Sequence, residues 1–454
     1  MGILNFHKYM KEKYGDAFQH KWLDFYDHVY IDMNYSLHYC NYNIKNEKQL
    51  FDKLFLFFDR TLHQAIPIKS LTTCIDGVAP LSKLLLQRKR RKNIASNTKP
   101  DNFDSLLFSS GTQFMKSVGN KIKDYTKFVQ YAYNIDVTYL DEHKDEIIDE
   151  AELKLKYAID CNIENNPNDT NIIVTNDADV IVMLSTCKKL DNIYVFYYTS
   201  GTSEIVSMKK LLDMHTDKVG KSLNYGLDFS FLNIMMGNDY FPKLGLVTFE
   251  KMFEVYTEVL KVSNDSLINE ELSINFNFFK SMLIKIIDKT KSKAYQTVTL
   301  DTFRKNVYKN YLDGLLWCLD TYKNGKCVRY NYTYNHLNPP HPLGIIMEID
   351  MERHELSLNK ETSKPLQSHL YLMLVLPSNA KHLIDTKYHD FFEEINKHEG
   401  KCDICNNFQK EINNNDEKNK LYEIKKQYTQ HKKSHEWTLD NIEMISQKFI
   451  NLYQ

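Results

Sequence analysis

Short apolar runs that alternate with helical patterns constrain the fold of this chain more than any other feature of its sequence. A strand followed by a helix and a second strand places the two strands parallel in one sheet. Five strand candidates therefore predict an α/β fold, with a mostly parallel central sheet flanked by helices. The candidates cover residues 28–34, 71–75, 135–139, 171–176 and 193–198.

Acidic residues stand at the ends of these runs and at their junctions with helices. The carboxyl ends of parallel strands lie at one edge of a sheet, so we expect seven carboxylates to converge there. Each acid taken alone also has an ordinary explanation, as a helix cap or as a favourable charge in a first helical turn. The seven are Asp32, Asp76, Glu150, Glu152, Asp177, Asp179 and Asp239.

Seven converging carboxylates would repel one another and could not all stay ionised without cations. A ligand set made only of oxygen atoms favours Mg²⁺ or Mn²⁺ over Zn²⁺. Two such ions, roughly 4 Å apart, would support in-line attack of water on a phosphodiester. The sequence therefore predicts that these acids are metal ligands and catalytic residues of a phosphoryl-transfer site.

A strongly basic segment follows Asp76, after a turn at Gly77 and Pro80. On a helix, four of its residues fall on one side at steps of three or four. Cations next to an acid suggest phosphate chemistry, although a charged, solvated helix is the ordinary explanation. The four residues are Lys83, Gln87, Arg90 and Arg91. The remaining cations, Arg88, Lys89 and Lys92, are expected to be solvated or to face a nucleic acid in a general way.

The order of these segments and their amino-acid sequences resemble those of the XRN family of 5′→3′ exoribonucleases. Residues 76–80, together with the four donors of the basic helix, are similar to the most characteristic motif of that family. The resemblance extends in pieces over residues 1–380, and the family falls within the wider group of 5′ nucleases that have a PIN-like core. The other matching segments are 1–6, 30–38, 103–105, 111–115, 177–179, 237–242, 311–317, 322–325, 364–366 and 374–377.

The resemblance implies a Mg²⁺-dependent enzyme that removes nucleotides one at a time from single-stranded RNA with a 5′-monophosphate, in mRNA decay. It implies that Lys83, Gln87, Arg90 and Arg91 form the 5′-phosphate pocket and that His38 stacks on a terminal base. Decapping or other RNA-decay proteins would be the partners of such an enzyme, and the cytoplasm its location.

The sequence departs from the family pattern in two places. The family usually has Gly-Glu-Gly-Glu-His-Lys where this chain has residues 149–154, which keep both acids but lose the glycines and the histidine. The family has a stacking Trp after the position of Gly325, and Tyr330 or Tyr332 would replace it here. The alternative is that these tyrosines are ordinary core or surface residues. The chain is also short for the family, which suggests a compact, viral-type member.

Domain organisation follows the motifs. Residues 1–245 are predicted to form a nuclease core with the metal site and the phosphate pocket, and residues 246–380 a mainly helical region that completes an RNA channel. Residues 381–454 form an extension in which four residues have the spacing of zinc ligands; the alternative is two free thiols and two surface histidines. The four are Cys402, Cys405, His431 and His435.

The other six cysteines stand alone and are expected to be reduced core thiols, which agrees with a cytoplasmic protein. No apolar stretch is long enough to span a bilayer, and no signal peptide is expected. A net charge of −1 means that nucleic-acid binding must rest on a local basic patch.

Two alternative functions remain open. One is a flap- or DNA-directed 5′ nuclease with the same metal site, which a pocket for a terminal phosphate disfavours. The other is an inactive relative that only binds RNA, which the retention of all seven acids disfavours.

Overall fold

The computed structural model divides the chain into two compact units. Unit 1 comprises Met1–Lys83, Asp101–Phe103 and Lys116–Pro365, and unit 2 comprises Leu84–Pro100, Asp104–Met115 and Leu366–Gln454. The structure describes residues 3–97, 102–141, 149–199, 202–240, 242–245, 247–263, 265–290, 305–334, 340–352, 357–396, 407–408, 410–412, 418–433 and 439–453.

Unit 1 contains a seven-stranded sheet with the strand order β1-β7-β6-β5-β2-β3-β4. The strands from β6 to β4 run parallel, and the antiparallel pairs β6–β7 and β7–β1 extend one side of the sheet. The strands are β1 (Phe18–Gln19), β2 (Phe25–Asp32), β3 (Ile66–Cys74), β4 (Asp136–Leu140), β5 (Asn171–Val174), β6 (Ile193–Thr199) and β7 (Thr202–Ser207).

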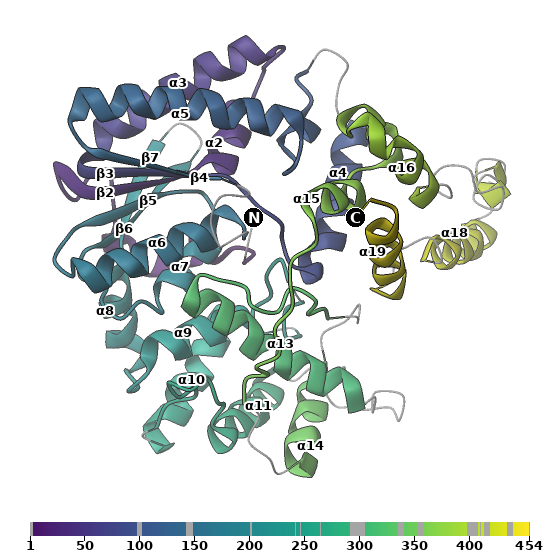
Figure 1. Cartoon of the computed structure of the whole chain (residues 1–454). Helices are drawn as coiled ribbons and strands as arrows, with labels where there is room; N and C mark the ends of the chain where they lie inside the picture. Colours follow the sequence, from purple (N-terminus) through teal and green to yellow (C-terminus); the bar gives the residue numbers. More distant parts are fainter. Residues whose placement is uncertain are drawn as a thin grey trace. The chain divides into compact units, whose positions relative to one another are not determined.

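Helices cover both faces of this sheet (Figure 1). One face carries α3 (Glu47–Gln64) and α5 (Gln113–Tyr133), and the other carries α6 (Ala151–Asn165), α7 (Asp179–Leu184) and α8 (Met208–Val219). Helix α3 begins after an N-cap residue, Asn46, whose side chain accepts a hydrogen bond from the Gln49 amide. Two short helices, α1 (Phe6–Lys13) and α2 (Met33–Cys40), precede β1 and follow β2.

A helical region completes unit 1. Its centre is α13, in which Trp317 is fully buried, stacks on Tyr332 with 4.6 Å between ring centroids, and donates to the Arg329 carbonyl. Large aromatic rings of this kind bury much apolar surface and fix the position of a helix. The helices are α9 (Tyr225–Ile234), α10 (Phe249–Ser263), α11 (Phe276–Thr290), α13 (Lys305–Asn324) and α14 (Pro342–Glu352).

Unit 2 is helical in its described residues. Ring contacts join α16 and the residue before it to α19, where Phe391 and Tyr388 both pack on Phe449. Helix α4 begins in unit 1 and continues in unit 2. The helices are α4 (Leu81–Asn97), α15 (Ser368–Val375), α16 (His389–Ile395), α18 (Lys418–Lys433) and α19 (Leu439–Tyr453).

The predicted fold class is confirmed, since all five strand candidates are strands of one mostly parallel sheet, and a helical region follows. Before the first predicted strand, α1 ends at Lys13, and Phe18–Gln19 and the residues from Phe25 onward pair as strands. The six cysteines predicted as core thiols are free, and all but Cys161 are buried. No helix in the described part of the chain is both long enough and apolar enough to cross a membrane.

Candidate active site

Parallel pairing brings three of the predicted acids to the same edge of the sheet. Asp32 ends β2 and lies in register with Cys74, so Asp76 follows the neighbouring strand two residues later. On the other side of β2, Ile31 pairs with Val174 of β5, which places Asp177 just beyond that strand. The sheet topology alone therefore accounts for the proximity of these carboxylates.

Backbone groups fix the position of Asp76. Its amide donates to Asn34 Oδ1 at 3.0 Å, and its Oδ1 accepts from the amide of Ala151 at 3.0 Å. The amide of Gly77 donates to the carbonyl of Asp149 at 3.0 Å. Because Ala151 begins α6, these bonds hold the end of β3 against the helix start that carries Glu150 and Glu152.

Asp32 and Asp177 also take part in local hydrogen bonds. Asp32 caps α2, with Oδ1 accepting from the Tyr35 amide at 3.0 Å and Oδ2 from the Thr175 hydroxyl at 3.3 Å. Asp177 Oδ1 accepts from the amide of Asp179 at 3.0 Å. The capping explanation of Asp32 is therefore correct, and it is compatible with a place in the acid cluster.

Asp179 is buried and held by two donors that are distant in sequence. The amide of Ile3 donates to its Oδ1 at 2.8 Å, and the hydroxyl of Tyr322 donates to its Oδ2 at 2.9 Å. The Tyr322 hydroxyl also accepts from Asn238, the residue before Asp239. These bonds join α7, the start of the chain and α13 around one carboxylate.

Lys83 lies among the remaining acids. Its Nζ is 2.5 Å from Glu150 Oε1, 3.3 Å from Asp239 Oδ2 and 3.8 Å from Glu152 Oε1. Tyr240 donates to Glu150 Oε2 at 3.0 Å. A buried ammonium group in this position offsets part of the negative charge of the cluster.

Electrostatic interactions connect all seven acids. Burial, followed by repulsion from Asp76, raises the pKa of Asp32 to about 7. Burial and Asp177 raise the pKa of Asp179 to about 8, and burial and Glu150 raise the pKa of Glu152 well above its usual range. Asp239 completes the set through its repulsion of Asp179.

The pKa of Glu150 is raised by burial and by its acidic neighbours, although Lys83 opposes the change. Burial disfavours the charged form of Lys83, but its attraction to Glu150, Glu152 and Asp239 outweighs this and raises the pKa of Lys83 well above its usual range. Lys83 is therefore a permanent cation inside an acidic cluster that needs positive charge.

The donor chemistry of this cluster suits a hard divalent cation, because every donor is a carboxylate oxygen. In the described residues, no three Asp, Glu, His or Cys side chains are arranged as a group that could hold a metal ion. In this structure Lys83 contacts three of the carboxylates that the sequence predicts as ligands.

The four predicted phosphate donors are divided between the units. Lys83 belongs to unit 1, and the other three belong to unit 2. In unit 2, Arg91 donates from Nη1 to Gln87 Oε1 at 2.9 Å and from Nε to Ser109 Oγ at 2.8 Å. The predicted spacing of four residues therefore brings Gln87 and Arg91 together, while Arg90 is partly exposed on the same helix.

The expectation that Arg88 is solvated was wrong. Its side chain is buried in unit 2, where Nη1 donates to the carbonyls of Leu374 at 2.7 Å and Leu376 at 3.1 Å, and Nη2 donates to Asn396 Oδ1 at 2.7 Å. These partners lie at the end of α15 and just after α16. Arg88 therefore binds helix ends that would otherwise leave carbonyl groups unpaired.

The two predicted stacking residues lie in different environments. His38 is an exposed residue of α2. The structure does not support a stacking role for Tyr330, because this residue is only 7% exposed and its hydroxyl donates to Asp149 Oδ1 at 2.6 Å. Of the predicted zinc ligands, Cys402, Cys405 and His435 lie outside the described residues, and for His431 only a backbone position in α18 is described.

Sequence reasoning missed Asp149, which has no exposed surface. Its Oδ2 accepts from the Cys327 amide at 3.2 Å, in addition to the Tyr330 hydroxyl bond, and burial raises its pKa to about 6. Asp149 directly precedes Glu150, so its position next to a predicted ligand could have identified it as a site residue. It also missed Tyr240, although that residue stands next to Asp239.

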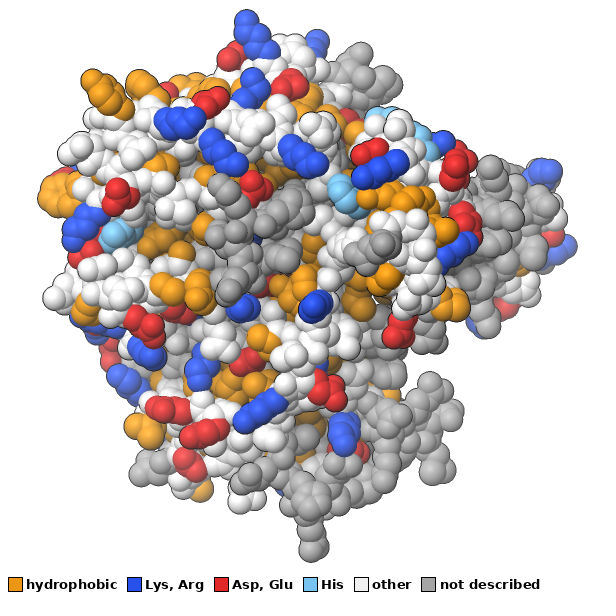
Figure 2. Space-filling model, viewed as in Figure 1, with side chains coloured by type: hydrophobic (Ala, Val, Ile, Leu, Met, Phe, Trp, Pro, Cys, Tyr) orange, Lys and Arg blue, Asp and Glu red, His pale blue; other side chains and the backbone are white. Residues whose placement is uncertain are grey.

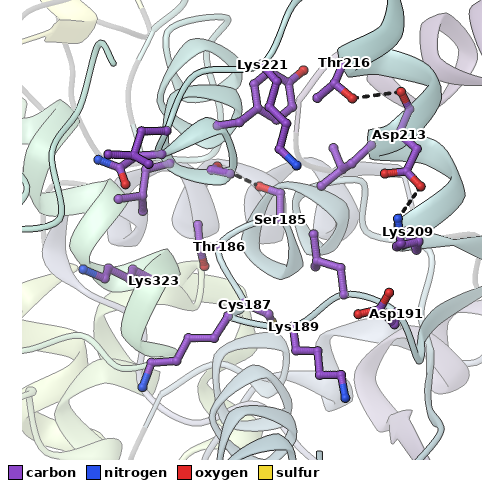
Figure 3. Close-up of a pocket in the computed structure, with 18 of the residues that line it drawn as sticks. Ser185, Thr186, Cys187, Lys189, Asp191, Lys209, Asp213, Thr216, Lys221 and Lys323 are labelled. Carbon is purple, nitrogen blue, oxygen red and sulfur yellow. Dashed lines mark hydrogen bonds and ion pairs between the residues drawn. The ribbon is translucent and has the colours of Figure 1, made fainter. Parts of the chain in front are cut away.

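The surface of unit 1 also has a cavity of about 690 Å³ that none of the predicted site residues lines (Figure 3). Its wall includes Lys209, which forms an ion pair with Asp213 at 2.5 Å, and Ser185, whose hydroxyl donates to the Gly226 carbonyl at 3.2 Å. Figure 2 shows Lys and Arg side chains interspersed with Asp and Glu over the visible face, in keeping with the net charge of −1.

Fold and site together define an α/β protein with a carboxylate cluster at the carboxyl edge of a parallel sheet. Residues 1–198 match the family model described as the XRN 5′-3′ exonuclease N-terminus. The chain is distantly similar to 5′-3′ exoribonuclease 1 of Schizosaccharomyces pombe, with 24% identity over 370 residues, or 68% of this chain and 26% of that protein. The human 5′-3′ exoribonuclease 1 is 21% identical over 378 residues, or 69% of this chain and 22% of that protein.

The chain thus aligns with about a quarter of the length of these curated relatives. Among solved structures, the catalytic core of Rad2 in complex with DNA substrate aligns with a TM-score of 0.40 and 14% identity, over 75% of this chain and 93% of that chain. The bacteriophage T5 D15 flap endonuclease, in a complex with DNA and metal ions, aligns with a TM-score of 0.33 and 10% identity, over 66% of this chain and 89% of that chain.

Proposed function

We propose that this protein is a metal-dependent 5′→3′ exoribonuclease that hydrolyses single-stranded RNA with a 5′-monophosphate to mononucleotides. The observation that carries the proposal is the cluster of seven mutually repelling carboxylates in unit 1. The match of residues 1–198 to the XRN 5′-3′ exonuclease model, and the distant similarity to 5′-3′ exoribonucleases, support the direction and the RNA substrate.

Mg²⁺ or Mn²⁺, as two ions, is part of this proposal. Bound ions would activate water at neutral pH and would offset the charge that develops on the phosphodiester. The ligands would come from the set Asp32, Asp76, Glu150, Glu152, Asp177, Asp179 and Asp239.

Other residues of unit 1 have defined roles in this scheme. Asn34 and the amide of Ala151 hold Asp76, and Tyr240 holds Glu150, so these carboxylates keep their orientation without a metal. Lys83 keeps a positive charge beside Glu150, Glu152 and Asp239, where it would also attract the scissile phosphate. Preorganised charges of this kind lower the barrier without rearrangement during the reaction.

The selection of a 5′ end is assigned to Lys83, Gln87, Arg90 and Arg91. Guanidinium groups bind phosphate through paired, charge-assisted hydrogen bonds, and the bond from Arg91 to Gln87 restricts the orientation of both side chains. His38, an exposed residue, would stack on a terminal base. Action in mRNA decay, decay-factor partners and a cytoplasmic location are the remaining parts of the proposal.

One assay tests the proposal and its alternatives. RNAs with a 5′-monophosphate, triphosphate, cap or hydroxyl, each labelled at the 3′ end, are compared with matched DNA with and without Mg²⁺. We expect Mg²⁺-dependent release of mononucleotides from the monophosphorylated RNA alone. Equal cleavage of DNA would favour the flap-type alternative, and RNA binding without cleavage at any metal concentration would favour an inactive relative.

A further inference from the structure

A second cluster of reactive side chains lies away from the carboxylate site. His28 of β2 pairs in register with Ser70 of β3 and with Asn171 of β5, two residues after Asp169. His28 precedes Asp32 by four residues, which corresponds to about 13 Å along a strand. The cluster therefore lies toward the amino ends of the parallel strands, opposite the edge that holds the acids.

The three side chains form a continuous hydrogen-bonded series. Ser70 Oγ lies 2.7 Å from His28 Nδ1, and His28 Nε2 lies 2.9 Å from Asp169 Oδ2. A carboxylate at Nε2 favours the tautomer with its proton on that nitrogen, which leaves the Nδ1 lone pair to accept the hydroxyl proton of Ser70. A nucleophile, a base and a carboxylate that orients the base therefore lie in the required order.

A second set of bonds fixes the carboxylate. Lys69 Nζ lies 2.7 Å from Asp169 Oδ1 and 3.1 Å from Asp27 Oδ1. Asp27 Oδ2 in turn accepts from the amide of Thr170 at 2.8 Å and from its hydroxyl at 2.9 Å. The residue that orients His28 is therefore itself held by its neighbours, as support of a catalytic base requires.

The series opens on a cavity of about 520 Å³. His28, Ser70 and Asp169 line it together with Gln130, Asn134 and Asn166. The His28 and Asp169 side chains are 11% and 14% exposed, so they are shielded but accessible from the cavity. Polar side chains make up most of this wall, and a polar cavity of this size suits a small ligand.

We propose that Ser70, His28 and Asp169 form a second catalytic site, which hydrolyses small polar carboxylic esters. Ser70 Oγ attacks the ester carbonyl carbon while its proton passes to His28 Nδ1. The ester C–O bond then breaks, and the leaving alcohol takes that proton. Water attacks the acyl group on Ser70, gives a proton to His28, and releases the carboxylic acid as Ser70 regains its proton.

The test uses a fluorophosphonate probe, which reacts covalently with activated serine hydroxyls, on the purified full-length chain. We expect one labelled site, mapped by peptide mass spectrometry to Ser70. Ser70→Ala should abolish labelling, and His28→Gln should slow it at least tenfold. Ser263→Ala is the matched control, because that serine is exposed at the end of α10, and it should label like the wild type.

Hydrolysis of p-nitrophenyl acetate gives a second readout, with an initial burst of one nitrophenolate per chain and its loss in Ser70→Ala. Asp177→Ala should label normally, which separates this proposal from the proposed ribonuclease activity. Two results would contradict the proposal: labelling of native protein no faster than of unfolded protein, or labelling of Ser70 that is unchanged in His28→Gln. Either result would mean that the hydrogen bonds among the three residues are purely structural.

Discussion

At the scale of single residues, the cluster depends on the charge of Lys83. Seven carboxylates in one buried region are unfavourable, and the raised pKa values of Asp32 and Asp179 express that cost. Lys83 offsets part of it through its contacts with Glu150, Glu152 and Asp239. The position of Lys83 on one side of a helix could be predicted from the sequence. The carboxylates that its amine contacts could not.

Replacing Lys83 with methionine should lower the free energy of unfolding by about 3 kcal/mol in EDTA, because buried carboxylates lose their counter-ion. Mg²⁺ or Mn²⁺ should restore much of this loss, since a bound cation supplies the same charge. Urea unfolding with and without metal measures both effects. Lys89→Met, at an exposed position of the same helix, is the control and should change little. A Lys83 variant as stable as the control in EDTA would contradict the assigned role.

His215 provides a pH-dependent contribution to stability. It is fully buried, and burial followed by the charge of Lys218 lowers its pKa to about 3. The unfolded chain takes up this proton near pH 6.5 and the folded chain does not, so the contribution to stability is present above pH 6.5 and is lost as the pH falls toward 3. The slope is about 1.4 kcal/mol per pH unit over that range.

The measurement is urea unfolding at pH 7 and pH 5, for the wild type and for His215→Phe. The acid cluster changes stability in the opposite direction, because carboxyls with raised pKa values stabilise the folded state as they become protonated. Only the difference between the two proteins therefore isolates His215. This difference should shift by about 2 kcal/mol between the two pH values. A constant difference would show that His215 is protonated in the folded state.

At the scale of helices and strands, the parallel part of the sheet was predictable and its antiparallel extension was not. The five predicted β-rich runs correspond to all five parallel strands. The strands β1 and β7 were not predicted. Strand β1 has only two residues, and both strands pair only in the antiparallel direction. The pairing of β1 with β7 joins segments that are distant in sequence. Arg88 and Arg91 show the same limit, because a helical pattern places side chains on a helix but does not identify its packing partners.

The turn after α9 sets the position of Asn238 and Asp239. Gly237 has a φ of +87°, and a Cβ there would lie 2.5 Å from the backbone nitrogen of Lys243. Gly237→Ala should therefore destabilise the protein by about 1–3 kcal/mol and reduce RNA hydrolysis. Gly15→Ala is the matched control, because a Cβ added to Gly15 would meet no other atom within 4 Å. Equal thermal stability of the two variants would contradict the assigned constraint on this turn.

Arg88 has a corresponding role in unit 2. Its removal would leave the carbonyls of Leu374 and Leu376 and the side chain of Asn396 without this donor. Arg88→Met should therefore cost about 3 kcal/mol in the unfolding of unit 2, and Arg88→Lys should recover only part of it because lysine lacks the planar fork. Hydrogen exchange of α15 and α16 measures the effect. Protection that is unchanged in Arg88→Met would contradict it.

At the scale of the whole molecule, we propose that seven carboxylates from distant segments act as one metal-dependent hydrolytic site. The sequence pattern predicted these acids at strand ends and helix junctions, and the sheet topology explains why Asp32, Asp76 and Asp177 meet. The sequence pattern did not reveal the residues that donate hydrogen bonds to these acids. Ile3, Tyr240 and Tyr322 are such donors, and only folding brings them next to the acids.

The most direct measurement compares Asp177→Ala with Asp217→Ala on 3′-labelled RNA with a 5′-monophosphate, in Mg²⁺. Asp177 follows β5 at the acid edge, whereas Asp217 is exposed on α8. We predict that Asp177→Ala lowers the rate of nucleotide release roughly 100-fold or more, as expected for loss of a proposed metal ligand, with RNA affinity largely retained. Asp217→Ala should behave like the wild type. Undiminished hydrolysis in Asp177→Ala would contradict the account.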